Sequence, residues 1–491
     1  MVVNSSYAQD AYSINRMNNN HSRRQFISLT GKGLLAAPLA FSLVECSPSK
    51  KATAAPPPDV VELAKKAAEA KRVLNVREFG ATGDGQTKDT LAFQQAIDRC
   101  SIMGGGEVLA PAGNYLCGAI QLRSNTLLRF EQEAVITGSP DFADYPVSQV
   151  RWEGKWVKGH TALLYAINAE NICIVGPGKI VGNPALGGRP NKEYPLRHPA
   201  LIEPIGCKNI LLTGFSTSNH LMWSMHPTDC ENLLFKNLTI RSTGGNGDGI
   251  DIDSCKNVQI DGCDIATGDD CISLKSGRGM EGYSLLHTTE NVVITNCTFA
   301  DSIFACIGIG SETSGGIRNV VIRNCKFIQA KTYAVYIKSR PGRGAFIEDI
   351  VVDNIDVSGT AGGFLRLNLL GSGIQDENPV PGDEGIPTVK NFHFSNIRVT
   401  DVPVLVEGTG VHPSKPLDGL VLSNITGTCS KGITLANMKN VQLSGIKVTG
   451  YTGPLLGTYN VSGSGLEGAV SIEAPKVPEP IVAPATPYQL H

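Results

Sequence analysis

Short alternations of apolar and polar residues recur along the chain from about residue 169, and each begins with a turn residue. In the stretch Asn209-Ile-Leu-Leu-Thr-Gly-Phe215, apolar residues stand one, three and six places after the turn. The same unit begins at Asn232, Asn257, Asn291, Asn319, Asp349, Asn391, Gly419 and Asn440. Alternation with period two predicts strands, and its recurrence every 21 to 42 residues predicts a solenoid. The pattern therefore predicts an all-β fold, a right-handed single-stranded parallel β-helix.

The sixth position of each unit predicts one column of stacked interior side chains. Its members are Phe215, Leu238, Cys263, Cys297, Cys325, Ile355, Ile397, Ile425 and Ile446. Cysteine occupies the same places as Phe and Ile in this column. Although the chain has 13 cysteines, we interpret Cys263, Cys297 and Cys325 as small buried hydrophobes rather than disulfide partners or zinc ligands.

A different pattern precedes the repeats. The Gly-rich turn Phe79-Gly-Ala-Thr-Gly-Asp-Gly85 leads to Asp89, which is expected to cap a helix over 90–100. Its apolar face is predicted to consist of Leu91, Phe93, Ala96 and Ile97. This short helix would cap the open N-terminal end of the solenoid. A phosphate-binding loop is the alternative, but no Gly-Lys-Ser/Thr follows the glycines.

The N-terminal stretch has the pattern of an export leader. Ser22-Arg-Arg-Gln-Phe-Ile27 precedes the apolar run Leu34–Val44, which is too short to span a bilayer. The two together resemble a twin-arginine export signal, so a periplasmic, secreted or surface-anchored location is expected. Leu43-Val-Glu-Cys46 is also similar to a lipoprotein acylation box, with Glu45 where a small residue is usual. A lipid anchor at Cys46 therefore stays open.

Length, composition and charge set the remaining limits. A chain of 491 residues exceeds the usual single core, but a repeat architecture removes that limit because each coil contacts only its neighbours. A net charge of −2 gives no basic surface for nucleic acid. We expect a monomer without nucleic-acid partners. The predicted division is an export signal over 1–46, a linker over 47–72, the β-helix domain over 73–460 and a C-terminal tail over 461–491.

Two acidic clusters stand about one repeat apart. They are Asn246-Gly-Asp-Gly-Ile-Asp-Ile-Asp-Ser254 and Thr267-Gly-Asp-Asp-Cys271. In a solenoid they would lie side by side on one face, where two acids can flank a glycosidic bond. The alternative for each acid is a turn residue. For Asp251 and Asp253 the alternation favours strand-edge or turn positions over a supporting role.

Taken together, six short motifs resemble glycoside hydrolase family 28, the polygalacturonase-like pectin hydrolases, in its bacterial branch. The resemblance covers about residues 73 to 450 and rests on Phe79–Gly85, Trp223-Ser-Met-His-Pro227, Asn246-Gly-Asp-Gly-Ile-Asp251, Gly268-Asp-Asp-Cys271, Ile309-Gly-Ser-Glu312 and Tyr336-Ile-Lys338. It implies an inverting hydrolase that needs no metal or cofactor.

The resemblance also implies a role for each acid. The family's Asn-Thr-Asp matches Asn246-Gly-Asp248, and its paired aspartates match Asp269 and Asp270. Asp269 would donate the proton, and Asp248 with Asp270 would activate water. Crowded like charges raise one pKa and keep that acid protonated. Inversion is expected to place acid and base roughly 6.5 to 9.5 Å apart.

The implied substrate is a pectic, uronate-containing glycan, so cations are expected in the cleft. Lys338 matches the Lys of the family's Arg-Ile-Lys and would pair with a uronate carboxylate. Arg340 and Arg343, in the adjacent Gly-rich turn, would add positive charge. Trp223 and His226 precede the acids by one strand, where an aromatic face can stack on a sugar; core packing is the alternative for Trp223. Asn246 completes the expected binding residues.

Two departures from the family pattern make polygalacturonate uncertain as the substrate. Phe304-Ala-Cys306 replaces Gly-His-Gly, and Tyr336 replaces the Arg of Arg-Ile-Lys. Rhamnogalacturonan, xylogalacturonan or a modified oligogalacturonide are then candidates. Two other classes stay open: a calcium-dependent pectate-lyase-like enzyme, with the aspartates as calcium ligands, and a β-helix that binds pectic glycans without cleaving them.

Overall fold

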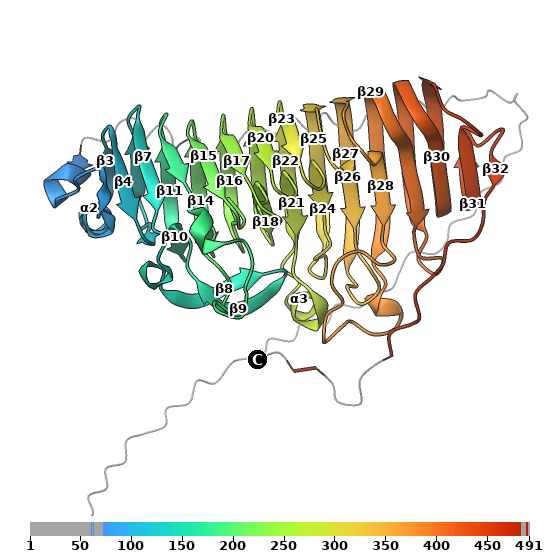
Figure 1. Cartoon of the computed structure of the whole chain (residues 1–491). Coiled ribbons are helices and arrows are strands. Elements are labelled where there is room, and N and C mark those ends of the chain that lie inside the picture. Colours follow the sequence, from blue (N-terminus) through green and yellow to red (C-terminus); the bar gives the residue numbers. More distant parts are fainter. Residues whose placement is uncertain (1–59, 61, 63–71, 483–487, 490–491) are drawn as a thin grey trace, which may run out of the picture. The chain divides into compact units, whose positions relative to one another are not determined.

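The computed structural model describes residues 60, 62, 72–482 and 488–489. Over 72–482 the strands of successive coils stack with parallel pairing, as a right-handed parallel β-helix from which one antiparallel hairpin departs (Figure 1). The predicted fold class is confirmed. The export leader, Cys46 and most of the predicted linker lie outside the described residues. No helix among the described residues is long and apolar enough to cross a membrane.

Each coil contributes strands to three faces. The first face contains β1 (Val73–Asn75), β3 (Gly106–Ala110), β6 (Thr126–Phe130), β11 (Glu170–Val175), β14 (Lys208–Thr213), β16 (Glu231–Lys236), β19 (Lys256–Asp261), β22 (Thr289–Thr295), β25 (Ile317–Phe327), β27 (Phe346–Val357), β29 (Thr388–Gly410) and β30 (Leu417–Thr449). The last four are long enough to bend onto the second face, and β29 and β30 also reach the third.

The second face contains β2 (Asp84–Lys88), β4 (Gly113–Cys117), β7 (Ala134–Gly138), β12 (Lys179–Val181), β15 (Ser216–His220), β17 (Thr239–Ser242), β20 (Asp264–Thr267) and β23 (Thr298–Ser302). The third face contains β5 (Ile120–Gln121), β10 (Leu164–Ile167), β13 (Ile202–Ile205), β18 (Ile250–Asp253), β21 (Ile272–Lys275), β24 (Ile307–Ile309), β26 (Tyr333–Lys338), β28 (Gly363–Asn368), β31 (Leu456–Ser464) and β32 (Val470–Ser471). The third face carries the predicted acids at its strand starts.

Insertions leave the solenoid at a few turns. They hold the antiparallel hairpin β8 (Val147–Trp152) and β9 (Lys155–His160), and the helix α3 (Gly279–Leu285). Among the described residues, short 3₁₀ helices are η1 (Val76–Phe79), η2 (Phe142–Asp144), η3 (Pro184–Leu186) and η4 (Asp383–Gly385).

The predicted turn residues form a ladder along the first face. Asn209, Asn232 and Asn257 have φ values of 57°, 61° and 56°, in the left-handed region that Asn tolerates better than most residues. The side-chain amide of Asn257 donates to Asn232, and that of Asn232 donates to Asn209, both at 3.0 Å. Each turn therefore fixes the next, and the sequence prediction of these turns is confirmed.

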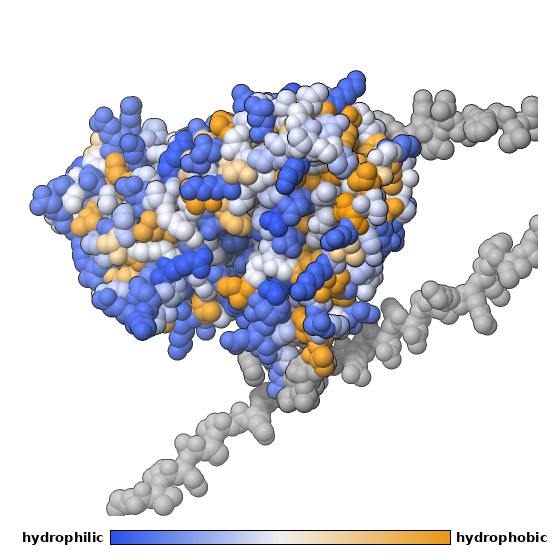
Figure 2. Space-filling model, turned by 45° about the vertical axis from the view of Figure 1, so that its right-hand side comes forward, coloured by the Kyte–Doolittle hydropathy of each residue, from blue (hydrophilic) through white to orange (hydrophobic). Residues whose placement is uncertain are grey.

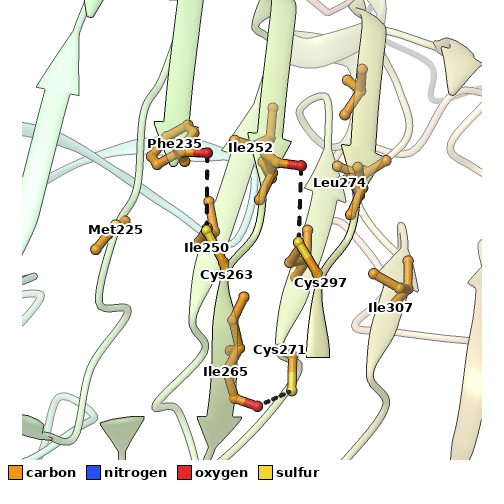
Figure 3. Close-up of a cluster of buried hydrophobic side chains, with 14 of the residues drawn as sticks. Met225, Phe235, Ile250, Ile252, Cys263, Ile265, Cys271, Leu274, Cys297 and Ile307 are labelled. Carbon is orange, nitrogen blue, oxygen red and sulfur yellow. Dashed lines mark hydrogen bonds between the residues drawn. The ribbon is translucent and has the colours of Figure 1, made fainter. Parts of the chain in front are cut away.

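The predicted interior column is buried, except at its last member. Its members from Phe215 to Ile425 are at most 2% exposed. Ile446 is partly exposed because the pairing of β30 with β31 stops at Gln442. All 12 described cysteines are free and buried, which confirms the prediction for Cys263, Cys297 and Cys325. The thiols of Cys263 and Cys297 donate to backbone carbonyls of neighbouring coils, among packed Ile and Phe side chains (Figure 3).

The N-terminal cap differs in detail from its prediction. The helix α2 runs from Thr90 to Ile102 and packs on the first coils. Its buried residues are Ala92, Phe93, Ala96, Ile97 and Cys100, whereas Leu91 is 67% exposed. The Asp89 carboxylate does not cap the helix; it accepts hydrogen bonds from the backbone N–H groups of Thr82 and Gly83. Asp89 thus fixes the Gly-rich turn, which carries no sign of a phosphate site.

The outer surface in view shows no wide apolar area. Figure 2 shows hydrophobic residues interspersed with hydrophilic ones on that side of the solenoid. Scattered single apolar residues are normal on a folded protein.

Candidate active site

The third face presents a row of outward side chains that changes from coil to coil. Pairing in register places along this row Asp251, Ser273, Gly308, Tyr336, Arg366 and Glu407. Polar and charged residues predominate in the row. This face can therefore hold a polar ligand.

A cavity of about 110 Å³ opens over the first half of this row. It is lined by Glu153, Trp223, Asn246, Asp248, Asp269, Asp270, Ser273, Lys275, Gly310, Ser311, Glu312 and Lys338. Six residues predicted from the sequence line it: Trp223, Asn246, Asp248, Asp269, Asp270 and Lys338. His226, Arg340 and Arg343 do not.

The three aspartates converge because the turns that carry them precede adjacent strands. Asp248 lies just before β18 and the pair Asp269–Asp270 just before β21, and the Gly249 N–H donates to the Asp270 carbonyl at 3.0 Å. One carboxylate oxygen of each aspartate lies within 4.8 Å of the others. This spacing is shorter than the roughly 6.5 to 9.5 Å expected from the inverting rule. The predicted separation is therefore wrong for the nearest oxygens, and a shared partner, Ser273, holds Asp248 and Asp270 close together.

Ser273 is one such shared partner. Its hydroxyl oxygen lies 2.9 Å from Asp270 Oδ2 and 3.3 Å from Asp248 Oδ2. The other oxygen of Asp270 accepts the Ala305 N–H at 3.0 Å. Asp248 and Asp270 are thus fixed as a pair, while Asp269 stands beside them and is more exposed.

Two buried lysines balance the charge of these acids. Lys338 Nζ lies 2.6 Å from Asp270 Oδ2. Lys275 Nζ lies 2.6 Å from Asp251 Oδ1 and 3.9 Å from Asp248 Oδ2. Burial lowers the pKa of Lys338, but the charge of Asp270 outweighs it and holds that pKa above the usual range. Both lysines therefore stay charged.

The acids differ in protonation. Burial, with the charges of Asp248 and Asp270, raises the pKa of Asp269 to about 8. Burial also raises the pKa of Asp248, but Lys275 counteracts part of that rise. One acid is thus protonated near neutral pH beside others that have cationic partners. This is the asymmetry that acid and base catalysis requires.

The sequence favoured strand-edge or turn positions for Asp251 and Asp253; Asp253 ends β18, whereas Asp251 lies inside it. Both lie within β18 and are at most 1% exposed. Asp251 pairs with Lys275, and Asp253 accepts from Arg151 Nε at 3.1 Å. Because each meets a buried cation, these acids position charged neighbours of the cavity.

His226 does not face the cleft, contrary to the prediction. It is fully buried, with Nδ1 2.9 Å from Glu203 Oε1. Trp223 is 2% exposed, and the ammonium of Lys275 lies 4.0 Å from its ring centroid, so its ring face is not free for a sugar. The packing alternative holds for Trp223, which forms the wall behind Lys275.

Arg340 and Arg343 support backbone rather than line the cavity. Arg343 is fully buried, and its Nε donates to the Ser311 carbonyl at 2.9 Å. Arg340 Nη1 donates to the Gly373 carbonyl at 2.6 Å. Each guanidinium donates to loop carbonyls and neither residue lines the cavity, so the structure does not place Arg340 or Arg343 among the substrate-binding residues predicted from the sequence.

Lys275, Ser273, Glu153 and Glu312 line the cavity but were not predicted. Lys275 and Lys338 both end a third-face strand, β21 and β26. Comparing these strand ends in the sequence would have indicated Lys275. Glu153 comes from the distant β8–β9 hairpin, which no local motif links to the acids. Gly308 leaves room for the ion pair, since a Cβ there would lie 2.3 Å from Asp270 Oδ2.

Ala305 stands where the resemblance led us to expect His, and Tyr336 stands where it led us to expect Arg; aromatic rings surround both positions. Phe304 and Tyr336 stack with ring centroids 5.8 Å apart. Lys338 Nζ lies 4.7 Å from the Phe304 ring centroid, within cation–π range. Tyr333 completes the cluster, and Ala305 lies beneath it. The ammonium of Lys338 is thus held between Asp270 and an aromatic surface.

Ion pairs join the insertions beside the cavity. Arg278, next to α3, lies 3.5 Å from Glu153 of the hairpin and 3.0 Å from Asp376 of the loop after β28. Lys155 and Arg151 of the hairpin both reach Glu281 of α3. Three segments distant in sequence therefore form one wall.

Comparison with known proteins shows which family the chain resembles. The family model described as glycosyl hydrolases family 28 matches residues 100–365. A protein named probable polygalacturonase from Vitis vinifera is 31% identical over 362 residues, 71% of this chain and 73% of its own length. An exo-poly-alpha-D-galacturonosidase from Dickeya chrysanthemi is 27% identical, over 77% of this chain and 68% of its own length.

A solved structure gives the same result. The exopolygalacturonase from Thermotoga maritima matches with a TM-score of 0.66 and 26% identity, over 79% of this chain and 96% of its own. The β-helix with an acidic cleft defines a glycoside hydrolase of the polygalacturonase-like type. The chain belongs to glycosyl hydrolases family 28.

Proposed function

We propose that the protein cleaves glycosidic bonds in pectic polysaccharide or oligosaccharide by acid and base catalysis with its three aspartates. Asp269 protonates the leaving oxygen, and Asp248 with Asp270 activates the attacking water. The observation that carries these roles is the raised pKa of Asp269, about 8, beside two carboxylates with lysine partners. An acid of that pKa holds its proton near neutral pH and can release it in the transition state.

Inversion is the stereochemical part of the proposal. Asp248 and Asp270 both contact the Ser273 hydroxyl. Two carboxylates this close can also hold one water molecule between them, in position to attack the anomeric carbon. Lys338 occupies Asp270 Oδ2, which makes that carboxylate a weaker nucleophile than a free one. Proton NMR of the first anomer formed decides the matter. Retention of configuration would contradict direct attack by water.

The proposed substrate is anionic. Relatives named for polygalacturonate or poly-galacturonoside activity support a galacturonate-containing chain. Lys338 and Lys275 supply positive charge in the cavity. The aromatic cluster of Phe304, Tyr333 and Tyr336 gives the neighbouring subsite an apolar surface, which suits rhamnogalacturonan or a modified galacturonide. A methyl or rhamnose group packs on such a surface better than a bare carboxylate does.

Two alternatives have weaker support. The three aspartates are close enough to hold a calcium ion, as a lyase would require. The ammonium groups of Lys275 and Lys338 already lie next to Asp248 and Asp270. Their positive charges would repel a divalent cation at the same place. A non-catalytic glycan-binding protein needs no protonated acid in its cleft, whereas Asp269 is such an acid.

Product analysis tests the function. The purified chain and its Asp269→Asn variant are incubated with polygalacturonate and with rhamnogalacturonan oligosaccharides, in the presence of a chelator. Saturated products from the parent chain alone are expected, and the preferred polymer names the substrate. Unsaturated products that vanish with chelator would establish the lyase, and no cleavage of either polymer would favour the binding protein.

Export by the twin-arginine route stays part of the proposal. It rests on Ser22–Ile27 and the apolar run after it. Mass spectrometry of the mature N-terminus from the native host tests it. A diacylglycerol-modified Cys46 would establish anchoring, whereas an unprocessed Met1 would contradict export.

A further inference from the structure

A second, larger cavity lies on the same face, beyond the aromatic cluster. It measures about 500 Å³, within the range of small-ligand sites. Its lining comes from β28, from the end of β29 and from the C-terminal segment: Arg366, Leu367, Asn368, Leu370, Gly371, Glu407, Thr409, Gly410, Pro475, Lys476, Val477 and Pro478. In Figure 1 this segment, dark red, runs back from β32 along the solenoid.

A continuous chain of contacts leads from the acids to this cavity. Lys338, paired with Asp270, lies 5.6 Å from the Tyr336 ring centroid. On the next coil, the Asn368 amide donates to the Tyr336 hydroxyl at 3.3 Å. Arg366 stacks over Tyr336 with its Cζ 5.3 Å from the ring centroid. Three coils separate Ser273 from Arg366, about 14 Å at the usual strand spacing.

The charge of the second cavity favours an anion. Arg366 and Lys476 provide two positive charges against the one carboxylate of Glu407. That carboxylate is already engaged, since it lies 3.2 Å from Arg366 Nη2 and accepts the Tyr333 hydroxyl. The Arg366 side chain keeps 34% of its surface exposed, and the aromatic rings fix the plane of its guanidinium. A fixed guanidinium with donors left over is suited to a carboxylate.

We propose that this cavity is a second subsite, in which Arg366 and Lys476 bind the carboxylate of a uronate residue several sugars away from the bond cleaved. The inference rests on the proposed function, because it concerns the same glycan. The C-terminal segment forms one wall of the subsite. Long oligosaccharides therefore gain binding that short ones cannot reach.

Chain-length dependence tests the proposal. kcat/KM is measured on galacturonate dimers and hexamers for the parent, for Arg366→Gln and for Arg398→Gln, a matched control in β29 whose exposed partner is Asp356. Arg366→Gln is expected to lower the hexamer-to-dimer ratio about tenfold, the loss of one charge-assisted hydrogen bond. The control is expected to keep the parent ratio. A parent-like ratio in Arg366→Gln would overturn the subsite.

Further arms separate the possible failures. Fully methyl-esterified hexamer carries no carboxylate, so with it the difference between parent and Arg366→Gln should disappear; a persisting difference would overturn uronate recognition. If Arg366→Gln does not fold, Lys476→Gln on the exposed C-terminal segment is measured in its place. Its hexamer-to-dimer ratio of kcat/KM is expected to fall severalfold. An unchanged ratio would overturn the proposal. Calorimetric binding of hexamer to Asp269→Asn, with and without Arg366→Gln, tests the subsite even if the parent chain cleaves nothing.

Discussion

On the first face each coil repeats the one before it, whereas on the third face adjacent coils present different side chains. Asn209, Asn232 and Asn257 make the same turn and the same amide bond. Asp251, Ser273 and Gly308 hold equivalent third-face positions yet share no chemistry. Repetition distributes stability over many weak equivalent contacts. The site instead gathers buried charges that each occur once. Mutations in the site should therefore change activity most, and mutations of the repeated turns should change stability most.

Asp269→Asn is the substitution with the largest expected effect, because it should abolish most of the activity and yet stabilise the fold. Loss of a general acid should reduce cleavage by about 10² to 10⁴-fold. The same change should stabilise the fold above pH 4. Because the folded-state pKa of Asp269, about 8, exceeds its ordinary value of 3.8, the folded chain binds the proton more tightly, and stability is lost as pH rises between these values. A melting temperature that exceeds the parent's increasingly from pH 4 to 8 checks this; an equal or lower one at pH 8 would contradict the raised pKa.

Gly308→Ala should disable the site and lower stability as well. The added methyl would lie 2.3 Å from Asp270 Oδ2 and 3.0 Å from Lys338 Nζ, so it would push apart a buried ion pair. A displacement of about 1 Å at reacting groups can reduce the rate about 10²-fold. Steady-state kinetics and a melting curve measure both effects. Gly245→Ala is the matched control because its methyl meets nothing within 4 Å; equal activity of the two variants would refute the crowding.

Asn232 tests the repetitive face. Asn232→Gly removes two amide hydrogen bonds but tolerates the φ of 61°, so a loss of about 1–3 kcal/mol in unfolding free energy is expected. Asn232→Ala adds about 1–2 kcal/mol for the left-handed conformation. Denaturant titration measures both, while kcat per folded molecule should match the parent. Equal losses for Gly and Ala would show that the turn changes its backbone conformation.

How far the sequence predicts the molecule depends on the same contrast. The turns and the interior column follow from local period-two alternation, and the aspartates follow from short motifs next to strand starts. The burial of His226 and the Lys275–Asp251 pair depend on which coils become neighbours, and this is set by turn lengths along the whole chain. Leu91 is exposed because helix α2 turns Ala92 and Phe93 toward the first coils instead. The rotation of one helix about its axis is not fixed by its own sequence. Side-chain contacts between coils on the third face, unlike the Asn ladder, carry no sequence period of their own.

The smallest expected effect is a shift in the pH dependence of kcat/KM. It also gives the most direct information on the protonation of the acids. kcat/KM should fall about tenfold per pH unit above pH 8, as Asp269 loses its proton. It should also fall at acidic pH, where Asp248 becomes protonated; the pKa of Asp248 is raised by burial and lowered in part by Lys275. Lys275→Met removes that lowering, so the acidic limb should shift to higher pH. Lys256→Met, which breaks an exposed pair with Glu290 on the first face, should leave both limbs in place. An acidic limb that stays fixed in Lys275→Met would show that a group other than Asp248 governs it, and the water-activating role would then belong to Asp270 alone.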